Sequence, residues 1–119
     1  MDGRIFKVPQ LPGTLPTLDE LVGVDGITVD NVAEHLLTLT GKSAPPRGHV
    51  FTLHAELEGM ALAPVFERLL AGWRAQGYVL TSTKTLFAQL DTSKLPIHEV
   101  IMAEVPGRSG TLAIQGPAV

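Results

Sequence analysis

Cysteine is absent from the 119 residues, which excludes a disulfide scaffold, thiolate zinc ligands and a cysteine nucleophile. Charge is also scarce, since 18% of the residues are charged and the formal net charge is −3. A slightly acidic chain lacks the basic stripe that nucleic-acid binding requires, so we expect no nucleic-acid partner. No apolar run approaches the roughly 20 residues of a transmembrane helix. The start, Met1–Arg4, lacks the layout of a signal peptide, so we expect a soluble or at most a peripheral chain.

Apolar residues, by contrast, make up 45% of the chain, and the mean hydropathy is +0.23. The length predicts a single domain over residues 1–119, with a core that folds without a disulfide or metal. The same composition gives more apolar surface than a small domain hides easily. We therefore expect a partner or a membrane surface to cover part of it.

Apolar spacing and capping residues predict four helices. Thr17 as the N-cap and Glu20 three residues later form a capping box, which predicts a short helix that ends at Gly23. A longer helix is expected from Leu62, because its apolar residues recur on one face, with Gly77 as the left-handed residue just past its end. The other two are predicted by the same signals over residues 30–40, where Gly41 should end the helix, and 83–90.

Short runs of β-branched and aromatic residues predict five strands, over residues 4–8, 49–54, 78–82, 100–105 and 111–115. Between the last two strands, the glycine-rich segment 106–110 resembles a phosphate loop but lacks its lysine, so we interpret it as a turn. Because strands and helices alternate in the middle of the chain, the fold class expected is α/β with parallel strands.

The residues after the 49–54 run are the candidates for chemistry. His54 and Glu56 fall at the carboxyl end of that strand, on one side of it, whereas His49 faces the other way. A histidine there can act as a general acid or base, or simply form hydrogen bonds at a strand end. Glu56 can orient His54, bind substrate or lie in water, and Glu58 fits a first-turn carboxylate of the next helix. Two such ligands are too few for zinc, which generally needs three.

The sequence also resembles a known family along nearly its whole length. The runs 49–59 (HVFTLHAELEG) and 62–78 (LAPVFERLLAGWRAQGY), with 9–20 and 105–115, are similar to the polysaccharide deacetylase (NodB-homology) family. The resemblance implies the carboxyl-terminal part of a distorted (β/α) barrel, with short extra strands at the C-terminus. It also implies metal-dependent hydrolysis of an N-acyl or N-formyl group.

The family's motifs assign roles to two residues. The Leu-His motif carries over to Leu53 and His54, which makes His54 the general acid and Leu53 part of the pocket wall. Leu53 and Glu56 are the candidate substrate-binding residues. The family holds a divalent metal, for which we expect zinc, through an Asp-Asp pair and a His-x-x-x-His motif. This chain has neither motif, so we assign no metal ligand and expect neither bound metal nor activity from this chain alone.

The resemblance further implies a substrate and a location. The substrate expected is a formamido-arabinose on undecaprenyl phosphate, a polyprenyl-phosphate sugar used to modify lipid A and to resist cationic peptides. The location expected is cytoplasmic, peripheral to the inner membrane, and the protein partner expected is a second copy of the chain or the missing amino-terminal half. The alternative is a non-catalytic α/β module that forms a homodimer or docks on a partner through its exposed half-barrel face.

Overall fold

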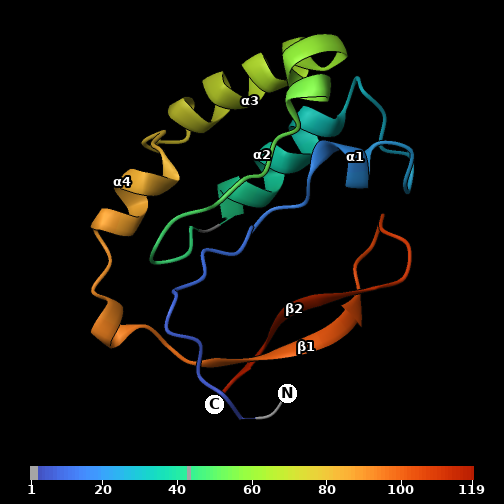
Figure 1. Ribbon diagram of the computed structural model, residues 1–119. Helices are drawn as coiled ribbons and strands as arrows, with labels where there is room; N and C mark the ends of the chain where they lie inside the picture. Colours follow the sequence, from blue (N-terminus) through green and yellow to red (C-terminus); the bar gives the residue numbers. More distant parts are fainter. Residues whose placement is uncertain (1–2, 43) are drawn as a thin grey trace. The chain divides into compact units, whose positions relative to one another are not determined.

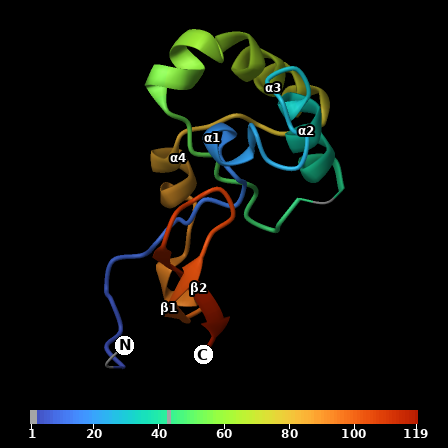
Figure 2. The ribbon, with the colours of Figure 1, turned by 90° about the vertical axis from the view of Figure 1, so that its right-hand side faces the viewer.

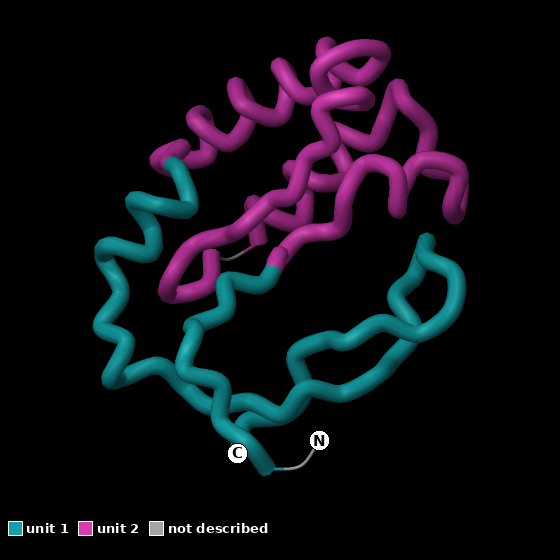
Figure 3. The backbone as a smooth tube through the Cα atoms, in the orientation of Figure 1, with its two compact units in different colours: residues 1–12, 82–119 teal, residues 13–81 magenta. Residues whose placement is uncertain are grey.

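The computed structural model describes residues 3–42 and 44–119, which form two compact units (Figure 3). One unit is residues 13–81, and the other combines residues 3–12 with residues 82–119. The single domain expected over residues 1–119 stays a prediction. The elements labelled in Figure 1, together with the turns η1 and η2, are, in chain order, α1 (Leu18–Leu21), α2 (Val32–Lys42), η1 (Leu57–Ala61), α3 (Ala63–Ala75), α4 (Thr83–Ala88), η2 (Thr92–Lys94), β1 (His98–Glu104) and β2 (Thr111–Ala118).

The predicted capping box is present at the start of α1. The backbone N–H of Thr17 donates to Glu20 Oε1 at 3.0 Å, which satisfies a donor that the helix leaves unpaired. The helix ends at Leu21, and the chain then turns at Gly23, whose φ of +92° suits a residue without a Cβ. The short helix is therefore confirmed, with its end two residues before the expected Gly23.

Helix α3 begins and ends where its sequence predicts. Pro64 lies in the first turn, where a missing N–H costs no helical hydrogen bond. At the other end Gly77 has a φ of +94°, and its N–H donates to the carbonyl of Arg74 at 3.0 Å. The N–H of Tyr78 reaches back to the carbonyl of Trp73 at 3.0 Å, which completes a Schellman motif.

The other two predicted helices are present with shifted ends. Helix α2 runs to Lys42, so the expectation that Gly41 ends it is wrong. The side chain of Asn31 lies at the start of this helix and accepts a hydrogen bond from the N–H of Thr28 at 2.8 Å. Helix α4 ends at Ala88, two residues earlier than expected.

The core of the unit formed by residues 13–81 lies between α1, α2 and α3. Helices α2 and α3 contact one another and lie side by side in both views (Figures 1 and 2). Phe51 packs its ring edge-on against Trp73, with the ring centroids 5.3 Å apart. The described residues bury seven apolar side chains: Leu18, Val32, Ala33, Leu36, Val65, Leu69 and Trp73.

The strands expected at residues 4–8, 49–54 and 78–82 are wrong, because these segments form no strand in the structure. Residues 49–54 run as a half-buried to exposed segment that is tied to Thr14. The N–H of Thr14 donates to the carbonyl of Val50, and the N–H of Val50 donates to the Thr14 hydroxyl, each at 2.9 Å. A strand needs a row of such bonds to a neighbour, and one residue supplies only a fragment of that row. The described part of the chain therefore contains no parallel sheet.

The last two predicted strands are confirmed and pair as an antiparallel hairpin. Ile101 lies opposite Ile114, and a bulge interrupts the register between His98 and Val100. Residues 105–110 form the turn, as expected for this segment. The fold is thus α/β in class, whereas the barrel stays a prediction. No helix in the described ranges combines the length and the apolar character that crossing a bilayer requires.

Candidate functional site

His54 lies where the extended segment turns into a helix. Its carbonyl accepts the N–H groups of Leu57 and Glu58, each at 2.9 Å, so His54 begins the helical turn that leads into η1. Residues 55 and 56 are already helical. The strand geometry that placed His54 and Glu56 on one side is therefore absent, and that expectation is wrong. His54 remains at the start of a helix, where its backbone is well fixed.

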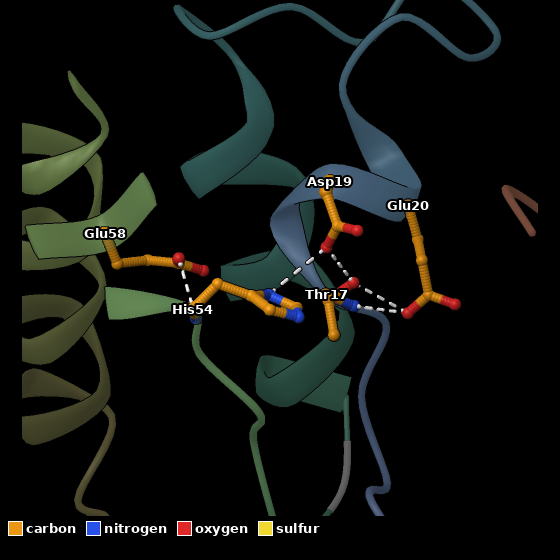
Figure 4. A network of polar contacts seen from close by, with 5 residues as sticks. All are labelled: Thr17, Asp19, Glu20, His54 and Glu58. Atoms are coloured by element: carbon orange, nitrogen blue, oxygen red, sulfur yellow. Dashed lines mark hydrogen bonds and ion pairs between the residues drawn. The ribbon is translucent and has the colours of Figure 1, made fainter. Parts of the chain in front are cut away.

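The imidazole of His54 faces Asp19 of α1 (Figure 4). Nδ1 of His54 lies 3.5 Å from Oδ1 of Asp19, and about a third of each side chain is exposed. The Nδ1 atom is buried and has no hydrogen-bond partner among the described residues. A distance of 3.5 Å is long for a hydrogen bond, so the contact is electrostatic in this state. Sequence reasoning missed Asp19, because the 34 residues between the two positions carry no signal that they meet.

Thr17, the N-cap of α1, holds the Asp19 carboxylate. The Thr17 hydroxyl lies 2.5 Å from Oδ1 of Asp19 and 2.8 Å from Oε1 of Glu20. One hydroxyl proton is therefore shared between two carboxylates, and the side chain that carries it is buried. The capping box thus has a second effect, since it fixes the carboxylate that faces His54.

Glu58 contacts His54 from the opposite side (Figure 4). Its Oε2 accepts the backbone N–H of His54 at 2.9 Å. Glu58 lies in the first turn of η1, which precedes α3, the helix for which it was expected as a first-turn carboxylate. The sequence analysis missed both its contact with His54 and its burial, for only 2% of the residue is exposed.

The other candidates lie beside this cluster. Leu53 is 46% exposed, and Glu56 is exposed at the N-cap of η1, so both side chains are accessible next to His54. Their roles in substrate binding stay predictions. His49 lies apart from this cluster, with Nδ1 2.9 Å from the Thr14 hydroxyl and its ring 5.9 Å from that of Tyr78.

A metal does not fit the residues that the structure describes. Among them, no three side chains of His, Cys, Asp or Glu gather in a way that would hold an ion. Asp19 and His54 provide only two ligand groups, whereas a protein zinc site generally has three or four. The described residues therefore do not complete a metal site.

What the arrangement can do is move a proton. A carboxylate beside Nδ1 favours the tautomer with a proton on that nitrogen, which leaves Nε2 to exchange protons with a bound molecule. Hydrogen bonds of this kind are often long before substrate binds and shorten afterwards. The geometry thus fits a histidine general acid or base that a carboxylate orients.

Comparison with known proteins agrees with the resemblance of the motifs, although no family model matches the chain. A probable 4-deoxy-4-formamido-L-arabinose-phosphoundecaprenol deformylase ArnD of Shewanella sediminis is 34% identical over 116 residues. The enzyme with the same name from Wigglesworthia glossinidia brevipalpis is 31% identical over 114 residues. The matches cover 98% and 96% of this chain but 37% and 38% of the relatives. The chain is similar to ArnD over nearly all its length and spans little more than a third of these relatives, consistent with a carboxyl-terminal portion.

Proposed function

We propose that this chain is the carboxyl-terminal part of a deformylase similar to ArnD. With the rest of that enzyme it would remove the formyl group from a formamido-arabinose on undecaprenyl phosphate. Two relatives with that name support the reaction, since each matches more than nine-tenths of this chain. The observation that carries the proposal is the pairing of His54 with Asp19 directly after Leu53.

In this proposal His54 is the general acid. Water adds to the formamide carbonyl, the C–N bond breaks, and the nitrogen leaves as an amine while formate is released. An amine leaves poorly as an anion, so a proton must reach the nitrogen as the bond breaks. Nε2 of His54 supplies that proton, while Asp19 orients the ring through Nδ1.

Leu53 and Glu56 are proposed to contact the substrate. Leu53 provides an apolar wall beside His54, because nearly half of its surface is accessible. Glu56 is an exposed carboxylate two residues after His54 and suits hydrogen bonds to sugar hydroxyls. The divalent metal, for which zinc is expected, is assigned to residues outside this chain.

The proposed function also implies a substrate, a cellular location and a protein partner. The substrate is a polyprenyl-phosphate sugar, and its amine product would serve lipid A modification and resistance to cationic peptides. The enzyme would work in the cytoplasm at the surface of the inner membrane, where a polyprenyl chain is anchored. Its amino-terminal half would complete the site.

The test is deformylation by a chimera, measured as release of formate. In the Shewanella enzyme the matched segment is replaced by this chain, and circular dichroism checks that each variant folds. We expect turnover by the chimera, none by this chain alone, and a loss of about a hundredfold or more in His54→Gln. His35→Gln is the control, since His35 is exposed on α2. Full turnover by His54→Gln would remove His54 from the mechanism, and turnover by the chain alone would refute its dependence on a second part.

The alternative, a non-catalytic module that docks on a partner, is supported by a different observation. The hairpin of β1 and β2 has no buried residue, and Ile101, Met102 and Leu112 are 37%, 60% and 42% exposed. Two-stranded hairpins have marginal stability by themselves, and an exposed apolar surface of this kind favours burial against a partner. Light scattering across a wide concentration range tests it, because a chain that stays monomeric contradicts the homodimer form.

A further inference from the structure

Glu58 is buried in a way that helix formation alone does not explain. Among the residues that the structure describes, it is the one charged side chain that is buried, at 2% exposure. Its Oε1 has no hydrogen-bond partner in the described part of the chain. Burial of a carboxylate oxygen without a partner is unfavourable. An exposed carboxylate in the same turn would favour the helix start equally through the helix dipole, without that desolvation.

In its buried position Glu58 forms hydrogen bonds with both backbone polar groups of His54. The N–H of His54 donates to Glu58 Oε2, and the carbonyl of His54 accepts the N–H of Glu58, each at 2.9 Å. Both backbone polar groups of His54 are thus tied to Glu58, four residues later. The imidazole leaves this fixed backbone on the side away from the Glu58 carboxylate and points toward Asp19 (Figure 4).

We infer that Glu58 is a positioning residue, which holds the backbone of His54 so that the imidazole faces Asp19. The inference rests on the proposed function, since it is the role of His54 as proton donor that gives this orientation its use. Substrate cannot reach Glu58 itself, because the carboxylate is covered. Glu58 therefore acts through His54 and takes no part in the bond changes.

The test uses this 119-residue chain and needs no substrate. Glu58→Met removes the acceptor at similar length, Glu58→Gln keeps an oxygen acceptor, and Glu56→Met is the matched control on an exposed carboxylate in the same turn. Two NMR measurements are made on each variant. The first is the hydrogen-exchange rate of the His54 amide, and the second is the change in the ¹⁵N shift of His54 Nδ1 when Asp19→Asn is added.

We expect Glu58→Met to speed exchange of the His54 amide by about tenfold or more, the size expected for one lost hydrogen bond to a charged group. We also expect the Nδ1 shift in Glu58→Met to stop responding to Asp19→Asn, while amides of α2 and α3 exchange at unchanged rates. Glu58→Gln and Glu56→Met should keep both properties. If the Nδ1 shift in Glu58→Met still responds fully to Asp19→Asn, the positioning role is refuted.

A variant that fails to fold does not end the test. If Glu58→Met loses the protection of α2 and α3, Glu58→Asp takes its place, because the shorter carboxylate keeps the charge and withdraws the acceptor from the His54 N–H. Retained coupling in that variant would equally overturn the inference. Failure of the deformylase proposal is seen separately, since formate release by the chimera does not enter either measurement.

Discussion

The contact between α2 and α3 depends on the absence of a side chain at Gly72. A Cβ placed at this position would lie 2.6 Å from both methyl carbons of Leu37 and 3.1 Å from its Cγ. Leu37 is half-buried on α2, so it has partial freedom to turn away. The packing of α3 on α2 locates the start of α3 and therefore η1, the turn that follows His54. Gly72→Ala thus tests the contact on which the site is built.

Two opposing effects set the magnitude. Alanine in a helix is more favourable than glycine by about 1 kcal/mol, whereas overpacking a contact costs about 1–3 kcal/mol. We therefore expect Gly72→Ala to lower the free energy of unfolding by about 0–2 kcal/mol. With Leu37→Ala already present the clash is gone, and the same substitution should raise the free energy of unfolding by about 1 kcal/mol.

The assay is urea unfolding followed by fluorescence of Trp73, the one tryptophan, which is buried in the same core. Gly59→Ala is the control, because a Cβ at Gly59 meets nothing within 4 Å, and its effect should be equal with Leu37 and with Leu37→Ala. The coupling between Gly72→Ala and Leu37→Ala should be about 1–3 kcal/mol. If Gly72→Ala changes stability equally in both backgrounds, within about 0.5 kcal/mol, the close approach of α2 and α3 is wrong.

Three further outcomes are expected. Thr17→Val removes the hydroxyl shared by two carboxylates and should cost about 1–2 kcal/mol in urea unfolding, whereas Thr38→Val, at an exposed position on α2, should change stability by less than about 0.5 kcal/mol. Leu69→Ala empties a fully buried position and should cost about 2–5 kcal/mol; a loss below about 1 kcal/mol would contradict the core. Hydrogen bonds from the Ser93 hydroxyl and N–H hold the pKa of Asp91 below its ordinary value. At a pH above that ordinary value the ionised carboxylate therefore stabilises the fold, and this contribution is lost as the pH falls through the lowered pKa. Ser93→Ala should raise the pKa of Asp91, measured by NMR titration of its carboxyl carbon, and an unchanged titration would contradict the contact.

The helices were the part of the fold that could be predicted best, and α3 shows why. Three signals for this helix lie within 15 residues of one another. They are Pro64 in the first turn, an apolar face whose last residue is Trp73, and Gly77 just after the helix end. The capping box of Thr17 and Glu20 is equally local. Helical hydrogen bonds join residues four apart, so the information that decides a helix lies inside the segment itself.

The strands could be predicted only where their partner lies next in the chain. The segments 100–105 and 111–115 were found because one short turn joins them into a hairpin. Residues 49–54 have the same β-branched and aromatic character, yet they form no ladder. Strand propensity reports that a segment fits a pleated surface, and it does not report whether a neighbour is present.

The candidate site divides in the same way. The position of His54 after Leu53 and of Glu58 in the first turn of a helix follows from residues close in sequence. The approach of Asp19 to His54, and the burial that ties Glu58 to the His54 backbone, depend on how residues 13–81 pack together. The sequence alone determined the helices, the terminal hairpin and the histidine, because each rests on neighbours a few residues away. Only the tertiary structure decided which carboxylates face that histidine, since packing brings together residues that the chain keeps far apart.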